Sequence, residues 1–371
     1  MKTYIGLDAG HNNLKLVGVD ESDSKIFKSL MPSYILSDRD LFRNTHPNSP
    51  GLVYYLAGQR VDLINKCWLM GESAVAANEW ASVPLASVDG GKGKVDYALH
   101  SLLSLLSKLP HRSEWDISLV CSNHRADVYA ELVREKINGE HQVLLAGQRS
   151  VVRVNVEKVV NEATHYKPKV GKETALIDFG GGTTILIKYG ADGRNADREV
   201  IDIGVDQLIN LIYDHEMTYS LLHKDRSRHL IRLGIEAYSQ SKDKPKNPNG
   251  SPIIWYGIKG KGGKEISLPY FACLNTWLRT YMKSILKNAR TALRSGASLE
   301  LIGGGAMLPG LEDILFTIFN AGDEIHTINK VSPAALWINS LALLEMAKPK
   351  PEVKTSANTS VFNKIETEVA A

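Results

Sequence analysis

The sequence is poor in cysteine, in aromatic side chains and in charge of one sign. Its 371 residues include three cysteines, Cys67, Cys121 and Cys273, which lie far apart and form no Cys-x-x-Cys pair. Neither a disulfide framework nor a thiolate zinc site is therefore predicted, and a reducing cytoplasm is expected. The 44 Lys and Arg residues nearly balance the 41 Asp and Glu residues, which excludes nucleic-acid binding by bulk electrostatic attraction.

Long apolar runs are also missing. The longest, residues 334–347, is too short to span a membrane and contains Asn339 and Glu345, so it predicts a buried helix. Near the N-terminus, Asp8 lies where a signal peptide would need its apolar stretch, and neither export nor membrane contact is expected. The composition turns polar and rich in Pro, Ser and Thr from residue 348, which predicts a flexible tail over residues 348–371. The remaining chain is long enough for two domains.

Two segments share one hairpin pattern. Residues 4–19 form a β-rich run with Asp8 near its end, a turn that starts at Gly10, and a second alternating run. Residues 174–189 repeat this order around Asp178 and three glycines. The repeat is too long for a solenoid unit and suggests two homologous lobes. The alternative is two unrelated hairpins, because Asp and Gly are common in turns.

Strand and helix patterns alternate along the chain, which favours an α/β fold. Residues 33–69 are expected to be a small insertion. Residues 240–265 are rich in lysine and are expected to form a solvated hairpin and linker; the alternative is that they contact a filament or a polyanion. Asp206 is predicted to cap the helix that follows Gly204. The other predicted elements are helices over residues 95–109, 126–137 and 270–295, and strands over 115–121, 142–156, 200–204 and 299–302.

The hairpin turns predict phosphate chemistry. Glycine and asparagine turns gather backbone N–H groups into a concave site for anionic oxygens. Asp8 and Asp178 place one hard oxygen ligand beside each turn, which suits Mg²⁺ bound through water, and they are the predicted metal pair. Lys15, on the returning strand, is either a point charge for phosphate or a surface lysine.

A third glycine cluster, LIGGGAMLPG, follows a predicted strand. It is not a dinucleotide fingerprint, because Leu308 stands where the third glycine belongs. Its small residues would let a flat base or ribose lie against the backbone. The Walker phosphate-binding pattern is not met either. In residues 258–265, Ile258 stands where its first glycine belongs and Glu265 where its serine or threonine belongs.

The segments LDAGHNNLK, LIDFGGGTT and LIGGGAMLPG, in this order, resemble the two phosphate motifs and the adenosine motif of the actin/Hsp70/hexokinase superfamily. Residues 137–166 resemble the ParM/StbA-type bacterial actin-like proteins. The resemblance covers residues 1–347 and implies an α/β, actin-like fold of two lobes, each a ribonuclease-H-like mixed sheet with helices, with a nucleotide cleft between them. It implies a first lobe of residues 1–165 plus about 333–347, with an insertion at about 33–94, and a second lobe of residues 166–332, with a subdomain at about 215–295.

The resemblance also implies roles for individual residues. Glu162 would orient the attacking water and, with Asp8 and Asp178, form the catalytic set; the alternative for Glu162 is a surface loop carboxylate. Two departures from the family pattern are Ser122-Asn123-His124 and Ala163-Thr164-His165. The implied phosphate-binding residues are Gly10, His11, Asn12, Asn13, Lys15, Gly180, Gly181, Gly182 and Thr183, and the implied base- and ribose-binding residues are Gly303, Gly304, Gly305 and Met307.

The function implied by the resemblance is that of a cytoplasmic ATPase, with ATP or GTP and Mg²⁺ as ligands, that polymerises with itself. Its filaments would segregate plasmid DNA through an adaptor protein bound to a centromere-like site, without direct sequence-specific DNA binding. One alternative is a sugar-type small-molecule kinase of the same fold. Another is a chromosomal shape or positioning actin homologue, which is disfavoured because the first strand begins too close to Met1 for an amphipathic membrane anchor.

Overall fold

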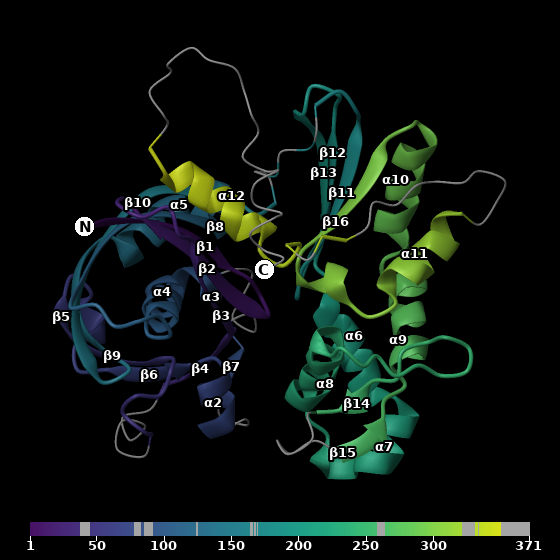
Figure 1. Cartoon of the computed structure of the whole chain (residues 1–371), viewed down its shortest axis with the longest axis horizontal. Coiled ribbons are helices and arrows are strands. Elements are labelled where there is room, and N and C mark those ends of the chain that lie inside the picture. Colours follow the sequence, from purple (N-terminus) through teal and green to yellow (C-terminus); the bar gives the residue numbers. More distant parts are fainter. Residues whose placement is uncertain are drawn as a thin grey trace. The chain divides into compact units, whose positions relative to one another are not determined.

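The computed structural model describes residues 1–37, 45–77, 83–84, 92–123, 125–163, 166, 168, 170–257, 264–320, 331–332 and 334–349. These residues form two compact units (Figure 1). Unit 1 contains residues 1–166 and the described residues from Trp337 onward, and unit 2 contains residues 167–336. Most of the predicted tail, residues 350–371, lies outside the described residues.

Unit 1 begins with the predicted hairpin. Strand β1 (Lys2–Ala9) pairs antiparallel with β2 (Asn13–Asp20), which pairs antiparallel with β3 (Phe27–Pro32). On its other side β1 runs parallel to β8 (Glu114–Asn123), and β8 runs parallel to β10 (Gln148–Asn161). The carboxyl ends of β1, β8 and β10 therefore meet at one edge of the sheet.

The same sheet continues through the region expected to be an insertion. Strand β10 pairs with β9 (Gly139–Leu145), and β9 pairs with β5 (Leu52–Gly58). Strands β6 (Cys67–Met70), β4 (Tyr34–Leu36) and β7 (Val83–Pro84) follow, which makes a ten-stranded sheet. Figure 1 shows that this sheet curls around a central helix, α4 (Ala98–Leu106).

Helices cover both faces of β1. Alternate side chains of a strand point to opposite faces, and Ile5 and Leu7 accordingly pack in the core that contains α4 and α5 (Ala126–Ile137). Tyr4 packs in a separate cluster with α12 (Ile338–Ala347). The helix predicted over residues 95–109 is in fact two, α3 (Lys92–Asp96) and α4, separated at Tyr97. Helix α2 (Glu72–Ala77) and a short 3₁₀ turn, η1 (Val61–Leu63), complete the helices described in this unit.

Gly6 sets the distance between β1 and α12. A Cβ atom at Gly6 would lie 2.3 Å from the carbonyl oxygen of Ser340 and 2.4 Å from the backbone nitrogen of Leu344. Backbone atoms of a helix cannot give way as a flexible side chain can, so only glycine permits this packing.

Unit 2 repeats the first strands of unit 1. Its sheet has the order β13 (Asn195–Ile201), β12 (Thr184–Tyr189), β11 (Thr174–Phe179) and β16 (Ser298–Ile302). The first two pairs are antiparallel and the pair β11–β16 is parallel, as in the sequence β3, β2, β1, β8 of unit 1. The internal repeat predicted from the two hairpins is therefore confirmed at the level of strand order and direction.

Helices of unit 2 pack on and below this sheet (Figure 1). The continuous helix predicted over residues 270–295 is wrong, because a π-helical turn at Trp277–Tyr281 separates α9 (Tyr270–Thr276) from α10 (Lys283–Arg294). Trp277 is fully buried, and its indole N–H donates to the carbonyl oxygen of Gly204 at 3.1 Å. Such π-helical turns occur mostly as single turns between stretches of α-helix. The other helices are α6 (Val205–Asp214), α7 (Glu216–Leu222), α8 (Arg228–Gln240) and α11 (Leu311–Phe319), with 3₁₀ turns η4 (His223–Asp225) and η6 (Gly304–Met307).

The lysine-rich segment contains a small antiparallel pair, β14 (Trp255–Tyr256) with β15 (Lys264–Ser267), which agrees with a hairpin there. Residues 258–263 of that segment lie outside the described residues. No helix in the described part of the chain combines the length and the apolar character needed to cross a membrane.

Candidate functional site

Asp8 lies at the carboxyl end of β1 with two polar partners. Lys15 stands opposite it on β2, and its Nζ lies 2.7 Å from Oδ2 of Asp8. Ser122, opposite Asp8 on β8, donates to Oδ1 at 3.0 Å. All three side chains are buried, so the prediction that Lys15 could be a surface lysine is wrong.

Asp8 is a carboxylate rather than a neutral acid at neutral pH. Burial alone would raise its pKa, but the charge of Lys15, the hydrogen bond from Lys15, the charge of Lys94 and the hydrogen bond from Ser122 together hold the pKa below its ordinary value. Opposite charge and hydrogen bonding to the charged form are the two effects that outweigh desolvation here. The site therefore contains a negatively charged carboxylate oxygen of the kind that binds cations.

Glu162 lies at the same edge of the sheet, directly after the end of β10. It is buried, which argues against a solvated loop carboxylate, and it is bound by Lys94 of α3, whose Nζ lies 2.5 Å from Oε1. Asn161, its neighbour, accepts a hydrogen bond from the backbone N–H of Ala126 at 3.0 Å and so ties this edge to the start of α5.

The sequence motifs mark neither Ser122 nor Lys94 as site residues. Ser122 appears only as a departure from the family pattern; it directly follows the strand predicted over residues 115–121, but the sequence does not place that strand beside β1. Lys94 belongs to a different segment, and no spacing in the sequence links it to Glu162. The structure brings Asp8, Lys15 and Ser122 together, with Lys94 and Glu162 beside them.

The turn of the first hairpin is tight. A Cβ at Gly10 would lie 2.6 Å from the carbonyl oxygen of Asn13. Ser33 supports the turn from outside, since its hydroxyl donates to the carbonyl oxygen of Gly10 at 2.7 Å and its N–H donates to that of Asn12 at 2.9 Å. His11, Asn12 and Asn13 are partly exposed at the tip.

The second hairpin has the same geometry. Asp178 is buried near the end of β11, and a Cβ at Gly180 would lie 2.7 Å from the carbonyl oxygen of Thr183. The N–H of Gly180 donates to that same oxygen at 2.9 Å. Among the described residues, no partner within the chain accepts a hydrogen bond from the N–H of Gly181 or Gly182. Two adjacent backbone donors at a turn are the kind of group that holds an anionic oxygen.

The second turn is fastened to helix α6. The N–H groups of Val205 and Asp206 donate to the carbonyl oxygens of Gly180 and Gly181 at 3.0 and 2.8 Å. The prediction that Asp206 caps this helix is wrong: the cap position is Gly204, and the Asp206 side chain instead pairs with Arg232 of α8 at 2.9 Å. The first N–H groups of α6 already have backbone partners, so no capping side chain is needed.

The third glycine cluster packs against β11. Gly303 has a φ of +83°, and a Cβ there would lie 2.2 Å from Oδ1 of Asp178. A Cβ at Gly305 would lie 2.6 Å from Val205 and 2.7 Å from Phe179. Gly304 differs, because a Cβ there would lie 3.5 Å from the side chain of Leu336, which is an ordinary van der Waals distance. Two of the three glycines are thus required by packing within unit 2.

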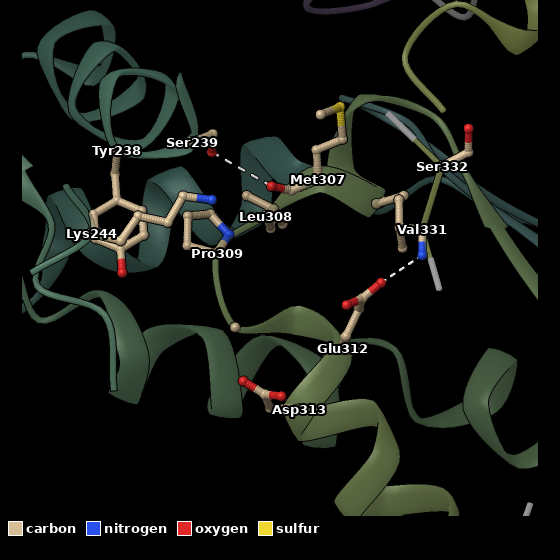
Figure 2. A pocket seen from close by; sticks show the side chains of 12 residues that line it. Tyr238, Ser239, Lys244, Met307, Leu308, Pro309, Glu312, Asp313, Val331 and Ser332 are labelled. Carbon is tan, nitrogen blue, oxygen red and sulfur yellow. Dashed lines mark hydrogen bonds between the residues drawn. The ribbon is translucent and has the colours of Figure 1, made fainter. Parts of the chain in front are cut away.

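Met307 borders a hollow of about 290 Å³ in unit 2 (Figure 2). Ser239 of α8 donates to the carbonyl oxygen of Met307 at 3.5 Å on one side, and Glu312 accepts from the N–H of Val331 at 2.6 Å on the other. Of the four residues expected to bind a base, only Met307 lines this hollow. The full lining is Tyr238, Ser239, Lys244, Ala306, Met307, Leu308, Pro309, Gly310, Glu312, Asp313, Val331 and Ser332.

The described residues contain no group of three or more His, Cys, Asp or Glu side chains arranged to hold a metal ion. Asp8 and Asp178 each supply one carboxylate at a strand end. Mg²⁺ commonly binds through one or two carboxylates while phosphate and water supply its other ligands, so each carboxylate taken by itself suits Mg²⁺ but not a metal held by protein ligands alone.

Comparison with known proteins gives similarity in structure only. No family model and no curated protein matches the sequence. A Bacillus thuringiensis ParM hybrid protein with ADP, containing two ParM mutants, aligns over 93% of this chain at 14% identity and a TM-score of 0.64; this chain spans 48% of its length.

Two further structures match along almost their whole length. B. thuringiensis ParM with ATP aligns over 93% of this chain and 98% of its own, at 15% identity and a TM-score of 0.61. ParM from a 15-stranded filament of Clostridium botulinum aligns over 93% and 99%, at 15% identity and a TM-score of 0.60. The predicted resemblance in fold is confirmed: the chain has the two-unit, mixed α/β fold of the ParM-type actin-like proteins.

Proposed function

We propose that this chain is a nucleotide-dependent, polymerising ATPase. The observation that carries the proposal is the repeated strand arrangement, in which each unit ends its hairpin strand with a buried aspartate and a glycine turn. Two of the similar ParM structures are complexes with ADP or ATP and a third is a filament, which supports nucleotide binding and self-assembly.

The residues divide into positioning and charge-bearing groups, as phosphoryl transfer requires. The backbone N–H groups of Gly181 and Gly182, with the turn at Gly10, would bind phosphate oxygens. Asp8 and Asp178 would hold Mg²⁺ through water, and the ion would neutralise charge on the phosphates. Glu162 would accept a hydrogen bond from water and orient it toward the terminal phosphate.

We further propose that the filament segregates plasmid DNA in the cytoplasm through an adaptor protein bound to a centromere-like site. The balanced charge of the chain, +3 overall, favours an indirect contact with DNA over a direct one. Loss of the plasmid from dividing cells that lack the chain, with retention when it is supplied again, is the expected result.

Light scattering and phosphate release, followed together after addition of Mg²⁺ with ATP or GTP, test the core of the proposal. We expect scattering to rise with bound triphosphate and to fall as phosphate is released. A chain that stays monomeric with ATP, GTP and their non-hydrolysable analogues would overturn it. Transfer of the phosphate to a sugar would identify a kinase of the same fold instead.

A further inference from the structure

A lysine outside all three motifs contacts the carboxylate proposed to orient water. The pair of Lys94 and Glu162 is nearly buried, with side chains 12% and 10% exposed. We propose that Lys94 is a positioning residue for hydrolysis, which fixes one oxygen of Glu162 so that the other faces the attacking water. This inference rests on the proposed ATPase function and adds a residue to its site.

At this edge of unit 1, Lys15 pairs with Asp8 and Lys94 pairs with Glu162. Lys15 is held on Asp8 by the register of the hairpin, at 2.7 Å. Glu162 therefore depends on Lys94 for a compensating charge, and a carboxylate buried without one is costly. Each of these two carboxylates thus has an ammonium partner among the described residues.

The geometry leaves one oxygen of Glu162 for water. Lys94 occupies Oε1, and among the described residues no donor lies on Oε2. Helix α3, which carries Lys94, packs against α4 and α5, so the ammonium is placed by a helix of the core and not by a solvated loop. A carboxylate held at one oxygen has a defined direction at the other, and misplacing such a group can cost about 10²-fold in rate.

The first experiment separates turnover from nucleotide binding. We expect Lys94→Ala to lower kcat about tenfold or more, because a misplaced reacting group can cost about 10²-fold in rate, while the affinity for ATP stays within about twofold. Lys94→Arg, which keeps the charge and the donor, should recover most of the rate. Lys158→Ala, an exposed lysine on β10, is the matched control and should leave both quantities unchanged.

The second experiment is a double-mutant cycle on kcat with Glu162→Gln. If Lys94 acts through Glu162, Lys94→Gln slows the wild-type chain and has no further effect in the Glu162→Gln background. If the double variant instead showed the product of the two single losses in kcat, Lys94 would act on the nucleotide directly and the inference would be overturned. A Lys94→Ala variant that hydrolyses ATP faster than wild type would also overturn it.

Folding is checked in the same samples. Thermal melting and the stoichiometry of nucleotide binding must show that each variant is folded, and the neutral double variant guards against a charge left buried alone. A Lys94 variant whose loss of rate follows only its loss of binding-competent protein would show a structural role and overturn the inference. A wild-type chain without ATP hydrolysis would overturn the proposed function and this inference together, whereas the outcomes above overturn the inference alone.

Discussion

Gly303 lies so close to Asp178 that a Cβ on the glycine would fall 2.2 Å from the carboxylate oxygen Oδ1. The loop after β16 therefore closes directly over the aspartate at the end of β11, its neighbour in the sheet. A side chain at position 303 would therefore displace the carboxylate of Asp178.

The first prediction concerns this aspartate. Asp178→Ala should abolish ATP hydrolysis while leaving unit 2 folded, because it removes a carboxylate proposed to hold Mg²⁺ without disturbing the backbone. Phosphate release and circular dichroism measure the two effects. Asp197 is an exposed residue on β13 that pairs with Lys188 of β12. Asp197→Ala is the control and should retain activity. Turnover of Asp178→Ala within a few-fold of wild type would refute the assignment.

The second prediction separates hydrolysis from binding. Glu162→Ala should retain nucleotide binding and slow hydrolysis by about 10²-fold, as positioned acid–base groups commonly contribute. Because disassembly is proposed to follow cleavage of the triphosphate, its filaments should form and then fail to decay. Parallel traces of light scattering and phosphate release measure this, with the exposed Glu135→Ala as control. Normal phosphate release would remove Glu162 from the mechanism.

The local features of this site could be predicted from the sequence, whereas the contacts between residues far apart in the sequence could not. Both hairpins and helix α5 are fixed by turn residues and by apolar spacing within short segments. The contacts of Asp8 with Ser122 and of Lys94 with Glu162 join residues 114 and 68 positions apart, and only the strand order brings them together. The interruption of the helix over residues 270–295 has the same origin, since its amphipathic spacing continues while Trp277 is directed to Gly204, 73 positions away.

The third prediction concerns the packing of α12. Gly6→Ala should lower the free energy of unfolding by about 1–3 kcal/mol or more, the range for overpacked cores, because its Cβ would meet helix backbone. Urea denaturation measures the change. Gly190→Ala is the control, since its Cβ would meet only the end of the exposed Asp192 side chain, at 3.0 Å, and no helix backbone. Equal stability of the two variants would contradict the close approach of Gly6 to α12.

The fourth prediction is a pH dependence. Asp20 accepts two hydrogen bonds from Arg112, each 2.7 Å, and these are the main reason that its pKa lies below the ordinary 3.8. The charged form is therefore favoured in the folded chain, which adds stability above pH 3.8 that is lost as the pH falls through the lower, folded-state pKa. Asp20→Asn should cost about 1–2 kcal/mol at neutral pH.

Urea denaturation of wild type and Asp20→Asn at several pH values measures this difference, which should shrink as the pH falls below 3.8. Asp116→Asn, an exposed residue on β8, controls for the loss of a surface charge. A difference that stays constant down to the acid limit would show that the charge of Asp20 is not the source of the stability.

The fifth prediction concerns the thiols. The three cysteines form no disulfide and are buried, and burial raises the pKa of Cys121 to about 12 and that of Cys273 to about 11. The reactive thiolate is therefore scarce at pH 8. We expect a disulfide reagent to label the native chain slowly and to titrate three thiols after denaturation. One thiol that reacts rapidly in the native chain would contradict this.

The attachment of the Gly180–Gly181 turn to α6 has a mechanical consequence. Because Val205 and Asp206 donate two backbone hydrogen bonds to the turn, a displacement of the turn would be passed directly to the first residues of the helix. A ligand that draws the turn inward pulls on the near end of a helix about 15 Å long, whose far end leads into α7 and its exposed Tyr219 and Leu221. If the turn binds phosphate as proposed, a small displacement there would be transmitted through α6 to the exposed side chains of α7.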